Sequence, residues 1–579
     1  MRTVMKYYKP YVWLIVFNLL FLLGQAMCEL ALPGYMSDII NNGIVVQDMD
    51  YIKRTGLIML AVSAATVCCS LLSSFLAARA SAKSSRDIRH ALFMRVTAFS
   101  AAELEEFSTA SLITRSTNDV QMVQQATVMI LRLACFAPIM GIGAVIRALD
   151  TSLSLSWTIG LALLVIIGIM AVSFFLVFPK FKVLQSKLDG LNLIMKERLS
   201  GMLVIRAFNT QKTEEQRFTA ANRELTRINM FVNRAMSFMM PSLMFVMNAV
   251  SILIVWAGAH LIEGGDLMIG DMLAYLQYAM HVIMSFLFIT MMFIMIPRAA
   301  VSAQRIGQVI DTEPTIEDPE KAETLADPRG LVEFRNVSFA YPDAEEKTLE
   351  NINFTVEPGK TTAIIGGTGS GKSTLVSLIP RFYDVTEGQV LMDGVDIREL
   401  TQHQLRDQIG YVPQKGLLFS GTIASNLQYG KEDATAEEMM DAAKTAQAAD
   451  FIGEKEHGLD EEVAQGGTNV SGGQKQRLSI ARALVKKPKI YIFDDSFSAL
   501  DFKTDKALRS ALKAKVGDST IIIVAQRINT IIDAEQIVVM DEGKVAGIGT
   551  HDQLMECCDV YREIALSQLS EEELERGRK

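Results

Sequence analysis

The stretch Gly366-Gly-Thr-Gly-Ser-Gly-Lys372-Ser373-Thr374 lies between two apolar runs, at 362–365 and 375–379. This order predicts a buried strand, a glycine-rich turn and a helix. The glycines allow successive backbone N–H groups to point at phosphate oxygens, Lys372 suits the β and γ oxygens, and the Ser373 hydroxyl suits Mg²⁺. A turn that fits the pattern without binding a ligand is the alternative for the motif alone, and the rest of the chain decides between them.

The composition indicates a membrane protein with more than one domain. The chain has 579 residues, of which 50% are hydrophobic, which is too long for a single core and too apolar for an ordinary soluble protein. The formal net charge of -9 leaves no dominant basic face, so we expect no nucleic-acid partner. The 6 cysteines give no pattern of a disulfide framework.

Six apolar runs of bilayer length precede the phosphate loop, and each predicts a transmembrane helix. They are residues 12–32, 56–76, 128–146, 155–178, 238–258 and 272–296. Lysine and arginine gather before the first run, between the second and third, and between the fourth and fifth, with Lys53, Arg54 and Arg147 as exceptions. Because positive charge stays on the inner side, we expect a multi-pass protein of the cell membrane with both termini and the phosphate loop in the cytoplasm.

The inner connections, 80–127 and 179–237, are long and keep a helical pattern of apolar residues. We expect the membrane helices to continue through them and to turn near 107–119 and 200–209, and disordered loops are the alternative. Beyond residue 310 the sequence becomes polar and is broken by prolines. The predicted domains are a transmembrane domain (1–310), a linker (311–330) and a nucleotide-binding domain with a helical C-terminal tail (331–579).

Three ionisable residues, Glu29, Arg132 and His281, lie within the predicted spans. Charge in lipid is costly, so we expect these side chains to face the bundle interior, a cavity or each other. Contact with a transported substrate and hydrogen bonding between helices both remain open for them.

Further motifs follow the phosphate loop. The apolar run 490–493 predicts a buried strand that ends in Asp494, a position that suits a Mg²⁺ ligand. Gln414 offers an amide to the same metal. Ser471-Gly-Gly-Gln474 opens a helix, and a helix N-terminus of this composition suits an anion.

These motifs, behind six spans, resemble ATP-binding cassette (ABC) exporter half-transporters over essentially the whole chain. The resemblance implies six transmembrane helices with long cytoplasmic extensions, fused to an α/β P-loop nucleotide-binding domain. It implies ATP and Mg²⁺ as cofactors and a second half-transporter as partner. Each ATP would lie between one chain's phosphate loop and the other chain's Ser471–Gln474 segment. Short coupling helices at the two predicted turns would contact the nucleotide-binding domains.

The resemblance also assigns roles to individual residues, with Tyr341 stacking on adenine. The residues assigned to ATP are Tyr341, Gly366, Gly367, Thr368, Gly369, Ser370, Gly371, Lys372, Ser373, Thr374 and Gln414, with Ser471, Gly472, Gly473, Gln474 and Asp501 acting on the partner's nucleotide. The residues assigned to Mg²⁺ are Ser373, Gln414 and Asp494.

Two catalytic positions depart from the family. Asp495 stands where the family has the glutamate that polarises water, and Gln526 stands where it has the switch histidine. Loss of one methylene withdraws the carboxylate by about 1.5 Å, and misplacements near 1 Å cost on the order of 10²-fold in rate. We therefore expect a heterodimer in which this chain's phosphate loop forms a degenerate, slowly hydrolysing site. Its intact Ser471–Gln474 segment would complete a competent site on the partner.

Two alternatives stay open. One is a homodimeric exporter with slow chemistry, and the other is an ATP-gated membrane regulator that does not pump. The apolar membrane domain suits a small amphiphilic, lipid or peptide substrate and does not distinguish among them. The six spans exclude a soluble ATPase.

Overall fold

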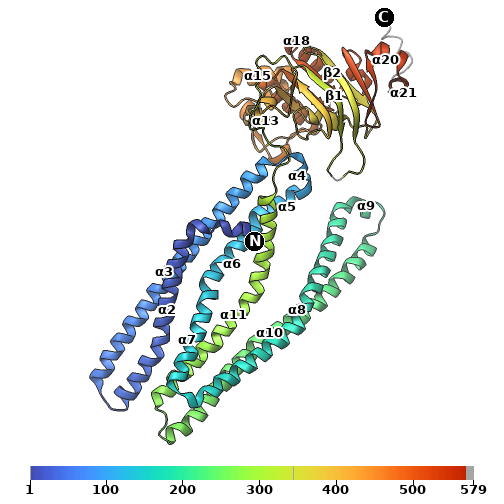
Figure 1. Ribbon diagram of the computed structural model, residues 1–579. Helices are drawn as coiled ribbons and strands as arrows, with labels where there is room; N and C mark the ends of the chain where they lie inside the picture. The colour runs from blue at the N-terminus through green and yellow to red at the C-terminus, as the bar shows by residue number, and fades with distance from the viewer. Residues whose placement is uncertain (1, 343, 569–579) are drawn as a thin grey trace. The chain divides into compact units, whose positions relative to one another are not determined.

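The computed structural model describes residues 2–342 and 344–568 and divides into two compact units (Figure 1). A helical unit contains residues 2–97 and 110–312, and an α/β unit contains residues 98–109 and 313–568. The predicted fold class, a helical membrane domain joined to an α/β domain, is therefore confirmed.

Six segments of the described chain are long and apolar enough to cross a membrane, and each overlaps one predicted run. They are Arg2–Ile44, Met49–Ala98, Thr109–Thr151, Leu153–Val177, Gln211–Glu263 and Ile269–Ile289. The elements of the helical unit are α1 (Arg2–Lys6), η1 (Lys9–Tyr11), α2 (Val12–Asp38), η2 (Ile39–Ile44), α3 (Met49–Ala98), α5 (Thr109–Thr114), η3 (Arg115–Asp119), α6 (Val120–Met129), η4 (Ile130–Ala134), α7 (Cys135–Thr151), η5 (Leu153–Leu155), α8 (Ser156–Ser200), α9 (Met202–Ala207), α10 (Gln211–Glu263) and α11 (Ile269–Asp311).

The long helices exceed the thickness of a bilayer. Helix α8 has 45 residues and α10 has 53, so at about 1.5 Å per residue they run for roughly 70–80 Å, against about 30 Å of hydrocarbon. The two helices lie side by side and are joined by the short helix α9 (Figure 1). Near α9 they are linked by ion pairs from Lys187 to Glu224 (2.9 Å) and from Arg217 to Glu197 (3.1 Å). The ends of α8 and α10 that meet α9 thus have the polar character of a segment outside the membrane.

A buried asparagine connects three membrane helices where the helical pattern is interrupted. Asn18 of α2 is fully buried, and its Nδ2 donates to the Leu131 carbonyl of the π-helical segment η4 at 2.9 Å. Ser73 of α3 donates to the Asn18 Oδ1 at 2.8 Å. Within an apolar environment an unpaired amide is costly, so these bonds fix the relative positions of α2, α3 and η4.

The α/β unit contains two main sheets, a six-stranded one of order β12-β11-β3-β10-β9-β6 and a four-stranded antiparallel one of order β2-β1-β4-β5. The strands are β1 (Val332–Phe339), β2 (Leu349–Val356), β3 (Thr361–Gly366), β4 (Glu387–Met392), β5 (Val395–Asp396), β6 (Ile409–Val412), β7 (Gly421–Thr422), β8 (Glu462–Val463), β9 (Ile490–Asp494), β10 (Thr520–Val524), β11 (Gln536–Asp541) and β12 (Lys544–Gly549). The helices are α4 (Ala101–Phe107), α12 (Lys372–Leu378), α13 (Gln402–Asp407), α14 (Ile423–Gln428), α15 (Ala436–Thr445), α16 (Ala449–Gly453), η6 (Gly458–Asp460), η7 (Gln465–Gly467), α17 (Gly472–Lys486), α18 (Phe502–Lys515), α19 (Ile528–Ile531), α20 (His551–Cys557) and α21 (Asp559–Gln568).

The larger sheet places the candidate site. Strands β3, β10 and β9 are neighbours, run parallel and are rich in buried isoleucine and valine, as expected for strands covered on both faces. Parallel strands end at the same edge. The register pairs Val524 with both Ile364 and Asp494, so the residues that follow β3, β9 and β10 meet at this edge.

Helix α4 belongs to the α/β unit although it follows α3 in the chain. It begins at a capping box, in which the Ser100 backbone N–H donates to Glu103 Oε2 at 2.7 Å, and it ends before Ser108, whose φ of 51° interrupts the helix. The Thr315 N–H donates to Glu103 (3.1 Å), and the Tyr383 hydroxyl donates to Glu105 (3.0 Å). The separate short helix therefore lies just upstream of the turn that we predicted at 107–119.

Candidate functional site

The phosphate loop has the predicted strand, turn and helix, formed by β3, residues 367–371 and α12. Two of its glycines are required by their surroundings. A Cβ at Gly366 would lie 2.1 Å from the Met540 carbonyl oxygen, and Gly371 has a φ of 90° with Leu349 only 2.7 Å from a built Cβ. A side chain at either position would displace the backbone that shapes the loop.

Lys372 lies inside the loop and is only 9% exposed. Its Nζ donates to the carbonyl oxygens of Gly366 (3.0 Å) and Gly367 (2.7 Å). Burial lowers the pKa of Lys372, and the nearby carboxylates of Asp495 and Asp494 partly oppose this shift. The ammonium is thus held at the centre of the loop by carbonyl groups that phosphate oxygens would replace as partners.

Oxygen ligands gather beside the lysine. The Ser373 hydroxyl donates to Asp494 Oδ1 at 2.9 Å, and the Tyr411 hydroxyl lies 3.4 Å from Asp494 Oδ2. Burial raises the pKa of Asp494, and the hydrogen bond from Ser373 partly offsets the rise. Sequence reasoning missed Tyr411, because its contact with Asp494 depends on the pairing of β6 with β9.

The two unusual residues of the sequence contact each other. Gln526 Nε2 donates to Asp495 Oδ2 at 2.8 Å, and Gln414 Nε2 donates to the same oxygen at 3.1 Å. Asp495 is 8% exposed and has a φ of 46°, a left-handed conformation that aspartate adopts more readily than most residues. Its carboxylate is therefore held by two amide donors from two different loops, and the Gln414 amide points at Asp495, whereas we predicted it as a ligand beside Asp494.

Tyr341 lies next to the loop, in a cluster of aromatic rings. Its hydroxyl is 3.0 Å from Thr374 Oγ1, and its ring packs edge-on against Phe339 and Tyr383, with centroids 5.0 and 5.3 Å apart. Burial and the hydrogen bond to Glu105 raise the pKa of Tyr383. The ring predicted to stack on adenine is thus fixed by neighbours on two sides.

The family profile of the ABC transporter transmembrane region matches residues 15–286, and that of the ABC transporter itself matches residues 349–498. An uncharacterized ABC transporter ATP-binding protein of Mycobacterium tuberculosis (strain CDC 1551 / Oshkosh), MT1311, is 39% identical over 97% of each chain. The chain belongs to the ABC transporter family.

Other relatives indicate which kind of ABC transporter the chain is. The uncharacterized ABC transporter ATP-binding protein YfiB of Bacillus subtilis is 38% identical over 99% of each chain. An ATP-dependent lipid A-core flippase of Desulfotalea psychrophila is 34% identical over 82% of this chain and 83% of the flippase. A bacterial Atm1-family ABC exporter solved with ATP bound has a TM-score of 0.79 at 26% identity and covers 96% of this chain and 98% of its own. The chain is thus an ABC exporter half-transporter that couples ATP hydrolysis to transport across a membrane.

The Ser471–Gln474 segment of the exporter half lies apart from the phosphate loop. Ser471 caps α17, with its Oγ accepting from the Gln474 N–H at 3.3 Å, and a Cβ on Gly473 would lie 3.4 Å from the Ala499 carbonyl oxygen. Asp501 caps α18 through the Thr504 N–H at 3.0 Å, and both capping residues are exposed. Among the described residues no hydrogen bond joins Ser471–Gln474 to the phosphate loop, residues 366–374.

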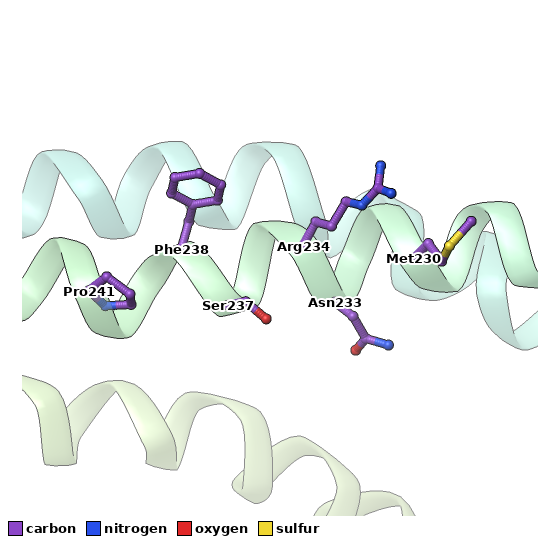
Figure 2. A pocket seen from close by; sticks show the side chains of 6 residues that line it. All are labelled: Met230, Asn233, Arg234, Ser237, Phe238 and Pro241. Atoms are coloured by element: carbon purple, nitrogen blue, oxygen red, sulfur yellow. The ribbon is translucent and has the colours of Figure 1, made fainter.

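The helical unit of the exporter half contains a cavity of about 440 Å³ along α10 (Figure 2). It is lined by Met230, Asn233, Arg234, Ser237, Phe238 and Pro241. Arg234 and Phe238 extend from one side of the helix, while Asn233 and Ser237 extend from the other (Figure 2). Arg223 and Arg227 share the helix face of Arg234, all three are exposed, and in the described part of the chain none of them forms an ion pair. Sequence reasoning missed this cavity because arginines at the end of a span are expected from the positive-inside bias alone.

The three intramembrane ionisable residues are not brought together. Glu29 of α2 and His281 of α11 are both half-buried. Arg132 lies in the π-helical segment η4 and is exposed. A single binding site made from all three is therefore not formed.

Proposed function

We propose that this exporter half pairs with a different half-transporter and works by alternating access. Its own phosphate loop holds ATP and hydrolyses it slowly, and its Ser471–Gln474 segment, with Asp501, completes a faster site on the partner's nucleotide. The observation that carries the proposal is the contact among Asp495, Gln526 and Gln414. Both departures from the family lie in one place, and that place is this chain's phosphate-loop site.

The contact explains slow chemistry in physical terms. A base must lie within hydrogen-bond reach of the water whose proton it takes, and aspartate ends about 1.5 Å short of glutamate. Asp495 Oδ2 already accepts two amide hydrogen bonds, at 2.8 and 3.1 Å, which orient the carboxylate towards Gln526 and Gln414. Water must displace one of these donors, or use the other oxygen, before the carboxylate can act on it. Gln526 itself offers the γ-phosphate a neutral amide where an imidazole could also carry charge.

The same site has the donor set for Mg²⁺. Ser373, Gln414 and Asp494 would hold the ion through a hydroxyl, an amide oxygen and a carboxylate, which are ligands that suit Mg²⁺. When bound, the ion neutralises charge on the β- and γ-phosphates. The raised pKa of Asp494 supports this assignment, because a carboxylate buried this deeply gains from a nearby cation. Lys372 would exchange its two carbonyl partners for phosphate oxygens when ATP enters.

Exposed features of both units support a second chain. Ser471 and Asp501 stand at exposed helix N-termini, where a partner's phosphates would meet backbone N–H groups. At α9, Leu203 is 81% exposed and Phe208 is 76% exposed. Such apolar side chains at the tip of a segment outside the bilayer call for a covering surface. A homodimer would cover them equally well, and only the residues at positions 495 and 526 argue for two different chains.

The cavity on α10 supports an amphiphilic substrate with an anionic head. Arg234 supplies a positive charge that has no ion-pair partner among the described residues. Asn233 and Ser237 supply hydrogen-bonding groups, and Met230 and Phe238 supply apolar surface. The lipid A-core flippases among the relatives make a lipid the first class to test. Arg234→Gln should weaken stimulation of ATPase activity by anionic lipids and leave zwitterionic lipids unaffected. Lys212→Gln, which removes the same charge at the start of α10, is the matched control, and equal effects of both variants would contradict the assignment.

The orientation follows the positive-inside bias: the nucleotide-binding domain and both termini face the cytoplasm of a cell-membrane protein. The partner is tested by purifying the tagged chain from its native membranes and determining the mass and sequence of what accompanies it. The expected companion is a second half-transporter with glutamate and histidine at the positions that match Asp495 and Gln526. Recovery of self-pairs alone would favour the homodimer. Transport into vesicles by the purified complex separates a pump from an ATP-gated regulator, which would change conformation without moving substrate.

A further inference from the structure

Helix α21 is the last described helix, and it is anchored on the α/β unit by Tyr561 and Ala565, which are both fully buried. Its final residue, Gln568, is itself exposed, but its side chain reaches back to the loop after β10. This loop carries Gln526, the residue that stands in place of the switch histidine. The helix is thereby connected to the nucleotide site, from which it is distant in the sequence.

Both halves of the Gln568 amide are used. Its Nε2 donates to the Gln526 carbonyl oxygen at 2.8 Å, and its Oε1 accepts from the Ile528 N–H at 2.9 Å. The two bonds lie on either side of Arg527. Helix α19 has only four residues, and its N-cap, Arg527, makes no side-chain cap, so the Ile528 N–H is one of the donors that a helix start leaves unsatisfied. Gln568 supplies the missing cap from another element.

The contacts form a short chain that ends at the catalytic carboxylate. Gln568 fixes the backbone of residues 526–528, and the Gln526 side chain, which leaves this backbone, donates to Asp495 Oδ2 at 2.8 Å. An amide side chain has several rotatable bonds, and it reaches a given oxygen reliably only when its own backbone is fixed. Loss of the two Gln568 hydrogen bonds would free residues 526–528 without changing Asp495 or any residue of the phosphate loop.

We propose that Gln568 is a positioning residue for this chain's ATP site, acting through the switch residue Gln526. The proposal concerns the geometry of the site and does not depend on whether the partner is a second copy or a different chain. Gln526 stands where the family has the switch histidine, whose partner is the γ-phosphate. The loss should therefore be seen with ATP and not with ADP, which lacks that phosphate.

The test uses the full-length chain purified from its membranes with whatever pairs with it. A radiolabelled azido-ATP is photo-crosslinked to this chain during a chase with unlabelled ATP, and the chain is separated by size. Gln568→Ala removes both of the Gln568 hydrogen bonds. It should raise the dissociation rate of the ATP probe about fivefold, the usual effect if the displaced Gln526 loses one hydrogen bond to the nucleotide, and leave the ADP probe unchanged. Ser567→Ala, the adjacent exposed position, is the matched control and should change neither rate.

The double variant decides whether Gln568 acts through Gln526. In a Gln526→Ala background, Gln568→Ala should add nothing to the ATP dissociation rate. The same fivefold change in both backgrounds, or equal changes for ATP and ADP, would overturn the proposal. Gln568→Glu keeps the acceptor for Ile528 but places an oxygen against the Gln526 carbonyl. Gln568→Glu should retain ATP as poorly as Gln568→Ala. Unchanged ATP retention in Gln568→Glu would also contradict the proposed role of the two Gln568 hydrogen bonds. A melting curve of each variant shows that the compared proteins are folded.

Discussion

Restoring the family's residues at positions 495 and 526 should raise hydrolysis at this chain's own site. The perturbation is Asp495→Glu, alone and with Gln526→His. In the present chain Asp495 Oδ2 accepts from Gln526 at 2.8 Å and from Gln414 at 3.1 Å. A glutamate carboxylate lies about 1.5 Å farther from the backbone and would pass these donors, and a histidine would remove one of them.

The size of the effect follows from the geometry. A misplacement of about 1 Å costs on the order of 10²-fold in rate, which corresponds to about 2.7 kcal/mol of activation free energy. Asp495→Glu alone should recover about tenfold, since the Gln526 amide still competes for the carboxylate, and the double variant should recover about 10²-fold. Asp495 has a φ of 46°, so glutamate should lower the free energy of unfolding by about 1 kcal/mol, because it is less easily accommodated there.

The assay must report on one site only. Azido-ATP labelled in parallel on the α- and γ-phosphates is crosslinked to the chain after a single turnover, and the ratio of γ- to α-label in the separated chain gives the fraction not hydrolysed. Asp433→Glu, at an exposed loop position, is the matched control for one added methylene. An unchanged ratio in the double variant, with ATP still bound, would refute the argument that these two residues limit the rate.

The other predictions concern the loop and its metal ligand. Lys372→Ala should abolish ATP retention by this chain, measured by photolabelling, yet leave part of the complex's ATPase activity, and complete loss would mean that both sites turn over equally. Asp494→Asn should raise the melting temperature at pH 7. The folded pKa of Asp494 is raised by burial, so its ionisation destabilises the folded state above that pKa. The gain should fade as the pH falls from the raised folded pKa to the unfolded pKa near 3.9, and the same gain at pH 3 would contradict the burial argument.

Local patterns made much of the fold predictable. The six spans follow from runs of apolar residues, and the phosphate loop follows from glycines whose positions permit no side chain, such as Gly366 beside the Met540 carbonyl oxygen. The limits of α4 depend on single residues, Ser100 at its start and Ser108 at its end, and the sequence predicted a turn near 107–119 without this helix. A pattern averaged over a turn or more does not contain this information.

The candidate site, like the fold, could be predicted only in part from the sequence. The sequence identified Asp495, Gln526 and Gln414 separately. Their convergence depends on the registers of β6, β9 and β10, which are set by contacts between distant segments. The hydrogen bond from Gln568 to Gln526 joins residues that are 42 positions apart and belongs to no sequence motif, so it can be found only in the structure. The cavity at Arg234 was likewise hidden, because a cation at the end of a span has a simpler explanation in membrane topology.

The central claim is that this phosphate-loop site binds ATP firmly and hydrolyses it slowly, so that fast turnover needs a partner with the full set of catalytic residues. The most direct measurement is the magnesium-dependent ATPase rate of the full-length chain purified without any companion and reconstituted in lipid, alongside its retained ATP. We expect ATP to be retained with a turnover rate on the order of 10²-fold below that of the two-chain complex. Vigorous turnover by self-pairs of this chain alone would contradict the account.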